Sequence, residues 1–198
     1  IQLVPNGCGV LVSQMKAGAR PDAYFSCDIS FMDDVSELFD SPTNVSSNDM
    51  VILVKNEMRG TIESLSDLTK PNIRVGTSHP EKSALGALTV RLLDHLKINV
   101  NSNKLLDSAT GDFLVNQLRA GSLDAVIVYR SNALANPSTL NDAFIVDIDE
   151  PMAVAIQPFA IGANSNHKSL MMRLLDALTG NESKLDFLKY GFKWEIKN

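Results

Sequence analysis

Three short segments combine small or polar residues with the expected start of a helix, which is an arrangement that binds anions. They are Gly7-Cys8-Gly9, Ser83-Ala84-Leu85 and Thr110-Gly111-Asp112. The first N–H groups of a helix have no partner within the helix, and the helix dipole places partial positive charge there. Glycine also lets the backbone approach a ligand closely. The three segments are therefore candidates for binding a tetrahedral anion, which needs many donors and no competing acceptors.

Alternating strands and helices are expected to position these segments. Continuous apolar runs predict buried strands, and apolar residues at helical spacing predict helices. The expected strands are 1–4, one within 18–28, 50–54, 73–76, 124–129, 144–148, 153–156 and 159–161, and the expected helices are 10–16, one near 29, 84–96, 113–118, 169–178 and 184–189. The polar stretch 44–48 is expected to be a hinge or linker. This alternation predicts an α/β fold with a mostly parallel sheet.

Length and composition limit the classes of protein that the chain can belong to. A chain of 198 residues can form one large domain or two small lobes. The net charge of −5 argues against nucleic acid or an anionic membrane as a partner, but not against a small anion. The longest apolar stretch, 152–163, is too short to span a bilayer. No basic leader followed by an apolar segment opens the chain, so no signal peptide is expected in it.

Enzymatic chemistry is poorly represented in the sequence. It holds no Gly-x-Ser-x-Gly elbow, no Gly-x-x-x-x-Gly-Lys phosphate loop and no His-Glu-x-x-His pair. A nucleophile pair of Cys8 and His79 lacks an evident third residue to orient it. The chain is therefore predicted not to be an enzyme, and to need no cofactor. Its two cysteines permit at most one disulfide and do not fix the compartment.

Several motifs along the chain resemble one known family in the same order. Asn6-Gly7-Cys8-Gly9 with the helix after it resembles a Ser-Ser-Gly loop, and Gly18-Ala19-Arg20-Pro21-Asp22 is similar to a Gly-Ala-Pro-Ala-Asp turn. The further matching segments are 50–54, 68–76, 79–86, 119–133 and the Lys-Tyr-Gly-Phe of 189–192. Together these segments resemble the periplasmic molybdate-binding proteins, which are the receptor components of ABC uptake systems.

The resemblance implies a two-lobed, type II periplasmic-binding-protein-like fold of mixed, mostly parallel sheets with flanking helices and two crossover hinge strands. Lobe 1 would hold residues 1–50 and 159–198, and lobe 2 would hold 51–158. Such lobes close on a ligand in the cleft between them. The family's fold normally begins with one more strand and helix ahead of Ile1.

The function implied is that of a monomeric periplasmic or other extracytoplasmic receptor, which captures molybdate or tungstate and delivers it to an ABC permease. Contact with that permease would be the only, peripheral contact with a membrane. An alternative with the same fold is the intracellular effector-sensing domain of a transcriptional regulator. A signal peptide in the native sequence would support the receptor, and a helix-turn-helix would support the regulator.

The resemblance also implies which residues bind the anion. Cys8 replaces a family serine, and Ala84 or Leu85 together with Gly111 would supply backbone N–H groups. Tyr129 would supply its phenolic O–H, although packing with a satisfied hydroxyl is the alternative. The ligand-binding residues are therefore predicted to be Gly7, Cys8, Gly9, Ala84, Leu85, Gly111 and Tyr129. Asp112 is expected to cap its helix and to face solvent.

Cys8 and Cys27 stand where the family carries small residues, at the carboxyl ends of neighbouring strands. Three alternatives follow from this placement. The two residues form a disulfide, as an oxidising periplasm allows, or they remain two unpaired thiols, or they bind a metal ion with His79. The third alternative fits no known zinc spacing, and no protein-bound metal cation is predicted.

Overall fold

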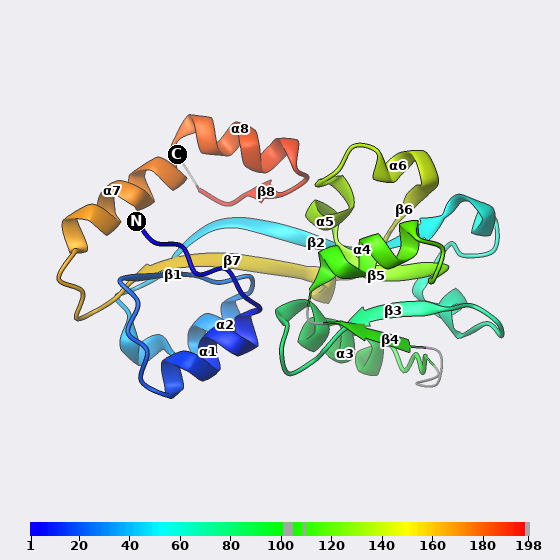
Figure 1. Cartoon of the computed structure of the whole chain (residues 1–198), viewed down its shortest axis with the longest axis horizontal. Helices are drawn as coiled ribbons and strands as arrows, with labels where there is room; N and C mark the ends of the chain where they lie inside the picture. Colours follow the sequence, from blue (N-terminus) through cyan, green and yellow to red (C-terminus); the bar gives the residue numbers. More distant parts are fainter. Residues whose placement is uncertain (101–104, 109, 197–198) are drawn as a thin grey trace. The chain divides into compact units, whose positions relative to one another are not determined.

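The computed structural model of the chain describes residues 1–100, 105–108 and 110–196, which divide into two compact units. Unit 1 consists of Ile1–Asn48 and Ala155–Asn198, and unit 2 consists of Asp49–Val154. The chain enters unit 2 within strand β2 (Thr43–Lys55) and leaves it at the start of strand β7 (Val154–Ile161) (Figure 1). The division into lobes that close on a ligand stays a prediction. Among the described residues, no helix is long and apolar enough to cross a membrane.

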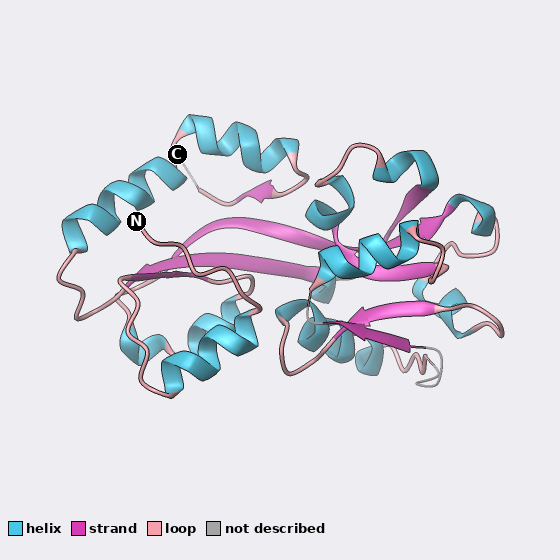
Figure 2. Cartoon of the chain, viewed as in Figure 1, coloured by secondary structure: helices cyan, strands magenta, loops and turns pink. Residues whose placement is uncertain are grey.

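Unit 1 combines an antiparallel sheet with helices (Figure 2). Strand β1 (Ala23–Phe25) pairs with β7 from Ala23↔Ile161 to Phe25↔Phe159. Strand β8 (Lys193–Trp194) pairs with the first part of β2 at Ser46↔Trp194. Its other elements are α1 (Cys8–Lys16), β1 (Ala23–Phe25), α2 (Ile29–Asp33), η1 (Ser36–Leu38), α7 (Lys168–Leu178), α8 (Asn181–Lys189) and β8 (Lys193–Trp194).

One hydrophobic cluster of unit 1 joins α1 to β1 and α2. Val12 and Met15 of α1 pack with Tyr24 of β1 and Met32 of α2, all of them buried. Apolar side chains that meet in this way remove their surfaces from water, which is the main force that fixes the elements together. The cluster therefore holds α1 against β1 and α2.

Unit 2 is built on a mixed sheet. Its strand β3 (Val75–Ser78) is parallel to both of its neighbours, β4 (Leu105–Ser108) and β5 (Ala125–Tyr129). The second part of β2 is antiparallel to β5 on one side and to β6 on the other, and its residues Val51–Val54 are fully buried. The remaining elements are η2 (Asn56–Met58), η3 (Leu65–Thr69), β3 (Val75–Ser78), α3 (Ala84–His95), β4 (Leu105–Ser108), α4 (Gly111–Arg119), β5 (Ala125–Tyr129), α5 (Arg130–Leu134), α6 (Thr139–Asp142), β6 (Ala143–Asp147) and η5 (Pro151–Ala153).

The predicted α/β fold with a mixed sheet and flanking helices is confirmed, although the parallel part is smaller than the sequence suggested. Among the described pairings, only those of β3 with β4 and β5 are parallel. Helices α1, α3, α4 and α7 begin within two residues of their predicted starts, whereas α8 begins three residues before its predicted start. Gly18 and Gly121 follow α1 and α4 with φ values of +112° and +81°, which only glycine adopts without strain.

Three expectations about strands are wrong. Residues 1–4 form no strand, and the side chains of Ile1 and Leu3 are 76% and 80% exposed, because no described strand pairs with the segment. The polar stretch 44–48 belongs to β2 rather than to a linker. Its buried hydroxyls have partners, since Ser46 donates to Gln157 Oε1 at 2.7 Å and Ser47 donates to Glu195 Oε1 at 2.5 Å.

The third error concerns β7, in which the two short strands expected at 153–156 and 159–161 are one continuous strand. Pro158 lies between the two expected ranges, and proline cannot donate to a ladder. Its carbonyl oxygen instead accepts the Ser26 N–H at 2.9 Å, so the backbone continues through the proline.

Candidate functional site

The first group of predicted ligand residues opens α1 in unit 1. Gly7 is the N-cap residue, and its carbonyl oxygen accepts the N–H groups of Val10 and Leu11 at 3.0 and 3.1 Å. Cys8 and Gly9 are the first two helical residues and are buried. The N–H groups of such positions have no acceptor within their own helix. The structure therefore brings Gly7, Cys8 and Gly9 together at the positive end of α1, as predicted.

The sulfur of Cys8 lies among hydrogen-bond donors from the chain that follows β1. The Cys27 N–H donates to Cys8 Sγ at 3.2 Å, and the Ser26 hydroxyl lies 4.0 Å from the same sulfur. The single hydroxyl proton of Ser26 has a closer acceptor in the Asp28 carbonyl oxygen, at 2.7 Å. Cys27 is consequently the principal partner of Cys8.

The hydrogen bonds around Cys8 favour its thiolate form. A hydrogen bond from the Cys27 thiol, helped by the Cys27 N–H and by Tyr24 and Ser26, lowers the pKa of Cys8 to about 6 against the opposing effect of burial. The same hydrogen bond and burial raise the pKa of Cys27 well above its usual value. Burial, followed by the charge on Cys8, raises the pKa of Tyr24. These contacts therefore favour a thiolate on Cys8 over a thiolate on Cys27.

The cysteines are free thiols in this structure, Cys8 buried and Cys27 half-buried. Their contact agrees with the expectation that the two positions meet in space, whereas disulfide formation between them stays a prediction. Among the described residues, no group of three His, Cys, Asp or Glu side chains is placed to hold a metal ion.

The second group of predicted ligand residues lies in unit 2, at the carboxyl ends of β3 and β4. His79 N–H donates to the Ser108 carbonyl oxygen at 2.6 Å, and Thr110 N–H donates to Ser108 Oγ at 3.2 Å. These contacts place the turn before α3 beside the turn before α4. The starts of both helices therefore lie at one edge of the same sheet, which is where ligands of open α/β sheets bind.

Helix α3 begins at Ala84, and the side chains of Ala84 and Leu85 are both buried. Alanine and leucine side chains carry no hydrogen-bond donor, so only the backbone N–H groups of these residues can donate to a ligand. Gly86 follows because a Cβ atom there would collide with the carbonyl oxygens of Ser78 and His79. This close approach holds the first turn of α3 against the end of β3.

Helix α4 begins at Gly111 after the N-cap residue Thr110, whose Oγ1 accepts the Phe113 N–H at 3.4 Å. The expectation that Asp112 caps this helix is wrong, because the cap must precede the first helical residue. Asp112 instead accepts a hydrogen bond from Asn132 Nδ2 at 2.8 Å. The carboxylate is thereby held by a neutral donor at the side of the helix start.

Asn132, which the sequence did not single out, joins Gly111 to Tyr129. Its Oδ1 accepts the Tyr129 N–H at 3.2 Å, and a Cβ atom on Gly111 would lie only 2.5 Å from the same oxygen. Tyr129 ends β5 and is 8% exposed. The available signal was an asparagine three residues after the end of a strand, in the first turn of a helix, where asparagine side chains bond the backbone.

Ser78 is a second residue that the sequence did not single out. It is the last residue of β3, it is 2% exposed, and its hydroxyl has no hydrogen-bond partner among the described residues. A buried hydroxyl without a partner loses its hydrogen bonds to water and gains none in return. The hydroxyl is therefore available to an acceptor that reaches the edge of the sheet where α3 and α4 begin.

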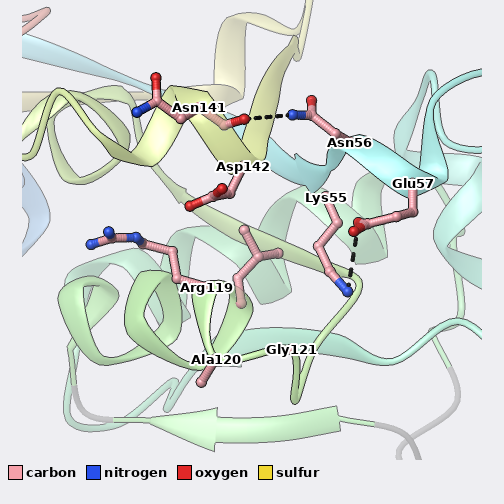
Figure 3. Close-up of a pocket in the computed structure, with 9 residues that line it drawn as sticks. Lys55, Asn56, Glu57, Arg119, Ala120, Gly121, Asn141 and Asp142 are labelled. Carbon is pink, nitrogen blue, oxygen red and sulfur yellow. Dashed lines mark hydrogen bonds and ion pairs between the residues drawn. The ribbon is translucent and has the colours of Figure 1, made fainter.

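One cavity of unit 2 lies away from these residues. It measures about 360 Å³ and lies beside Lys55, Glu57, Arg119, Asn141 and Asp142 (Figure 3). Lys55 pairs with Glu57 at 3.6 Å, and Asn56 donates to the Asn141 carbonyl oxygen at 2.9 Å. Arg119 is the last residue of α4, and a nine-residue helix is about 13 Å long. The cavity therefore lies at the negative end of α4, the end opposite to Gly111.

The family model for bacterial extracellular solute-binding proteins matches residues 1–193. The chain therefore belongs to the bacterial extracellular solute-binding protein family. This is a family of binding proteins that serve transport.

Individual relatives show a narrower similarity. The chain is 33% identical over 132 residues to the molybdate-binding protein ModA of Mycobacterium bovis and of Mycobacterium tuberculosis. The match covers 65% of the chain but only 49% of those proteins, so the chain spans about half the length of the curated relatives it matches.

Solved structures confirm the type II periplasmic-binding-protein fold. The periplasmic molybdate-binding protein of Azotobacter vinelandii superposes with a TM-score of 0.81 at 14% identity, over 96% of this chain and 86% of that one. The sulfate-binding protein SubI of Mycobacterium tuberculosis gives a TM-score of 0.76 at 16% identity, over 94% of this chain and 73% of that one. At these identities the likeness shows the fold alone.

Proposed function

We propose that this protein is an extracytoplasmic receptor for a tetrahedral oxyanion, molybdate or tungstate, which it delivers to an ABC permease. The similarity to the mycobacterial molybdate-binding protein ModA is the observation that carries this proposal. The helix starts support it, because each presents N–H donors and a positive dipole end to a small anion. None of the relatives reported above is described as a transcriptional regulator.

The proposed ligand residues are the two groups described above, one in each unit. The candidate donors of unit 1 are the backbone N–H groups of Gly7, Cys8 and Gly9, of which that of Gly7 donates to Asn6 Oδ1 at 2.9 Å in this structure. The candidate donors of unit 2 are the Tyr129 hydroxyl and the backbone N–H groups of Ala84, Leu85 and Gly111. Charge-assisted hydrogen bonds stabilise by roughly 1.5–3 kcal/mol each, so about five to seven of them support micromolar or tighter binding after ordering costs.

A panel of anions tests the proposal. Thermal unfolding of the protein would be followed with molybdate, tungstate, sulfate, phosphate and a small carboxylate. A ligand at 100 times its dissociation constant stabilises the folded state by about 2.7 kcal/mol. Molybdate and tungstate should raise the melting temperature most. The proposal fails if the carboxylate stabilises the protein as much as any of the oxyanions does.

A paired substitution shows whether stabilisation comes from the proposed residues. Gly111→Ala places a methyl group against Asn132, whereas Gly180→Ala changes the N-cap residue of α8, where the nearest atom to the new Cβ would lie 3.3 Å away. Stabilisation by molybdate should disappear in the first variant and persist in the second. Equal stabilisation of both would place the anion elsewhere.

A further inference from the structure

The thiol pair of unit 1 has the features of a reactive site rather than of two packed core residues. Cys8 opens a helix, where the dipole favours a negative charge, and the Cys27 N–H donates to its sulfur at 3.2 Å. Cys27 lies two residues after the end of β1 and is half-buried, so the pair is reached from solvent through Cys27. An inert buried cysteine has neither donors at its sulfur nor a second cysteine beside it.

We propose that Cys8 and Cys27 are a redox-active thiol pair, in which a peroxide oxidises the Cys8 sulfur and Cys27 then closes a disulfide that a dithiol reductant reopens. Peroxide is the fitting oxidant because it is small, whereas Cys8 is only 1% exposed and would not admit a bulky disulfide partner. Cys27 supplies the nearby resolving thiol that a reversible oxidation requires.

The proposed reaction balances in two steps. The Cys8 thiolate attacks one oxygen of hydrogen peroxide, the O–O bond breaks, and the departing hydroxide takes up a proton to leave as water. The Cys27 sulfur then attacks the sulfenic sulfur of Cys8, so an S–S bond forms, the S–O bond breaks, and a second water leaves with the Cys27 proton. The two thiols lose two electrons and the peroxide accepts them.

A consequence for ligand binding rests on the proposed function. The reduced Cys8 thiolate carries a negative charge at the helix start where the oxyanion is proposed to bind, and it uses the Cys27 N–H as a donor. A disulfide is neutral and a poorer acceptor, so oxidation removes the repulsion and releases that donor. The oxidised protein is therefore expected to bind a dianion about tenfold more tightly than the reduced protein.

Peptide mapping of the wild-type protein tests the pair without any anion. The protein would be titrated with hydrogen peroxide, and its free thiols alkylated and mapped by mass spectrometry. We expect a Cys8–Cys27 disulfide, seen as the loss of two hydrogen atoms, and recovery of both thiols with dithiothreitol. In Cys27→Ser, peroxide should carry Cys8 on to the sulfinic acid, and in Cys8→Ser, Cys27 should stay reduced. Two thiols that remain alkylatable after excess peroxide, or oxidation of Cys27 alone, would overturn the proposal.

Titration with molybdate in the two redox states separates this inference from the proposed function. A disulfide with tenfold tighter binding supports both. A disulfide with unchanged or weaker binding overturns the charge argument. A disulfide with no molybdate binding in either state refutes the proposed function and leaves the redox pair standing. Molybdate binding without any disulfide refutes the pair alone.

Discussion

The two groups of candidate ligand residues are built on the same device, a helix start beside the end of a strand, but they differ in chemistry. The unit 1 group at α1 contains the Cys8 thiol, whose pKa is lowered by hydrogen bonds from Cys27, and the Cys27 N–H lies 3.2 Å from its sulfur. The unit 2 group at α3 and α4 consists of buried aliphatic residues, a glycine and a tyrosine, fixed by the neutral side chain of Asn132. From this comparison we expect the contribution of unit 2 to anion affinity to be constant. The contribution of unit 1 is expected to depend on the redox state of Cys8 and Cys27.

The largest effect on molybdate affinity is expected from a substitution that disrupts the unit 2 group. In Gly111→Ala the new methyl group would lie 2.5 Å from Asn132 Oδ1, and two hydrogen bonds hold the Asn132 amide, one at Oδ1 and one at Nδ2. The Asn132 amide or the start of α4 must then shift, and we expect molybdate affinity to fall about 100-fold, or about 2.7 kcal/mol. Calorimetric titration measures this loss. Gly180→Ala is the matched control, and a similar loss there would mean that the effect is not local.

The next prediction concerns the hydrogen bonds between Arg74 and Asp124, which stabilise the fold of unit 2. Asp124 accepts hydrogen bonds from the backbone N–H of Arg74 at 2.9 Å and from its guanidinium group at 3.0 and 2.5 Å, which ties the start of β3 to β5. Asp124→Asn should lower the free energy of unfolding by about 2–3 kcal/mol in urea denaturation. Asp176→Asn, on α7 of unit 1, is the control and should change the free energy of unfolding by less than about 0.5 kcal/mol.

The same ion pair gives a pH dependence with a definite sign. Hydrogen bonds from Arg74 lower the pKa of Asp124 in the folded protein. The stabilisation is therefore complete above the unfolded pKa of about 4, and it is lost as pH falls through the lower folded value. Wild-type stability minus that of Asp124→Asn should shrink on acidification through that range. A difference that stays constant from neutral pH to strong acid would contradict the assignment.

A smaller effect is expected from the hydroxyl of Tyr129, a side-chain donor proposed in unit 2. Tyr129→Phe removes the hydroxyl and keeps the ring, so we expect molybdate affinity to fall about tenfold while the fold is retained. Tyr190→Phe is the control, because Tyr190 is exposed and lies after α8. Equal affinities for the Tyr129→Phe and wild-type proteins would assign Tyr129 to packing alone.

The smallest effect distinguishes two buried hydroxyls that both lack partners among the described residues, those of Ser78 and Thr139. Ser78→Ala and Thr139→Val should each leave the free protein as stable as before, or more stable by up to about 1 kcal/mol, because an unsatisfied group is removed. Only Ser78→Ala should weaken molybdate binding, by about threefold, since Ser78 ends β3 at the edge of the sheet where α3 and α4 begin. An identical response of the two variants to molybdate would exclude a role for Ser78.

Local signals explain why the helix starts were predictable. Gly7, Ser83 and Thr110 each precede a helix at the point where the sequence changes from polar or small residues to an apolar period, and this change needs no knowledge of the rest of the chain. The contacts of Asn132, Tyr24 and Ser26 were not predictable, because they depend on which strand ends meet. The prediction for the polar beginning of β2 was wrong for the same reason, since its partners Gln157 and Glu195 lie more than a hundred residues away in the sequence.

Direct calorimetric titration of the reduced protein with molybdate, set beside sulfate and phosphate, tests the central claim most directly. The account predicts one molybdate ion per protein, bound with micromolar or tighter affinity, with binding weakened in both Gly111→Ala and Tyr129→Phe. Absence of binding to every one of these anions would contradict it. So would molybdate binding that neither substitution changes.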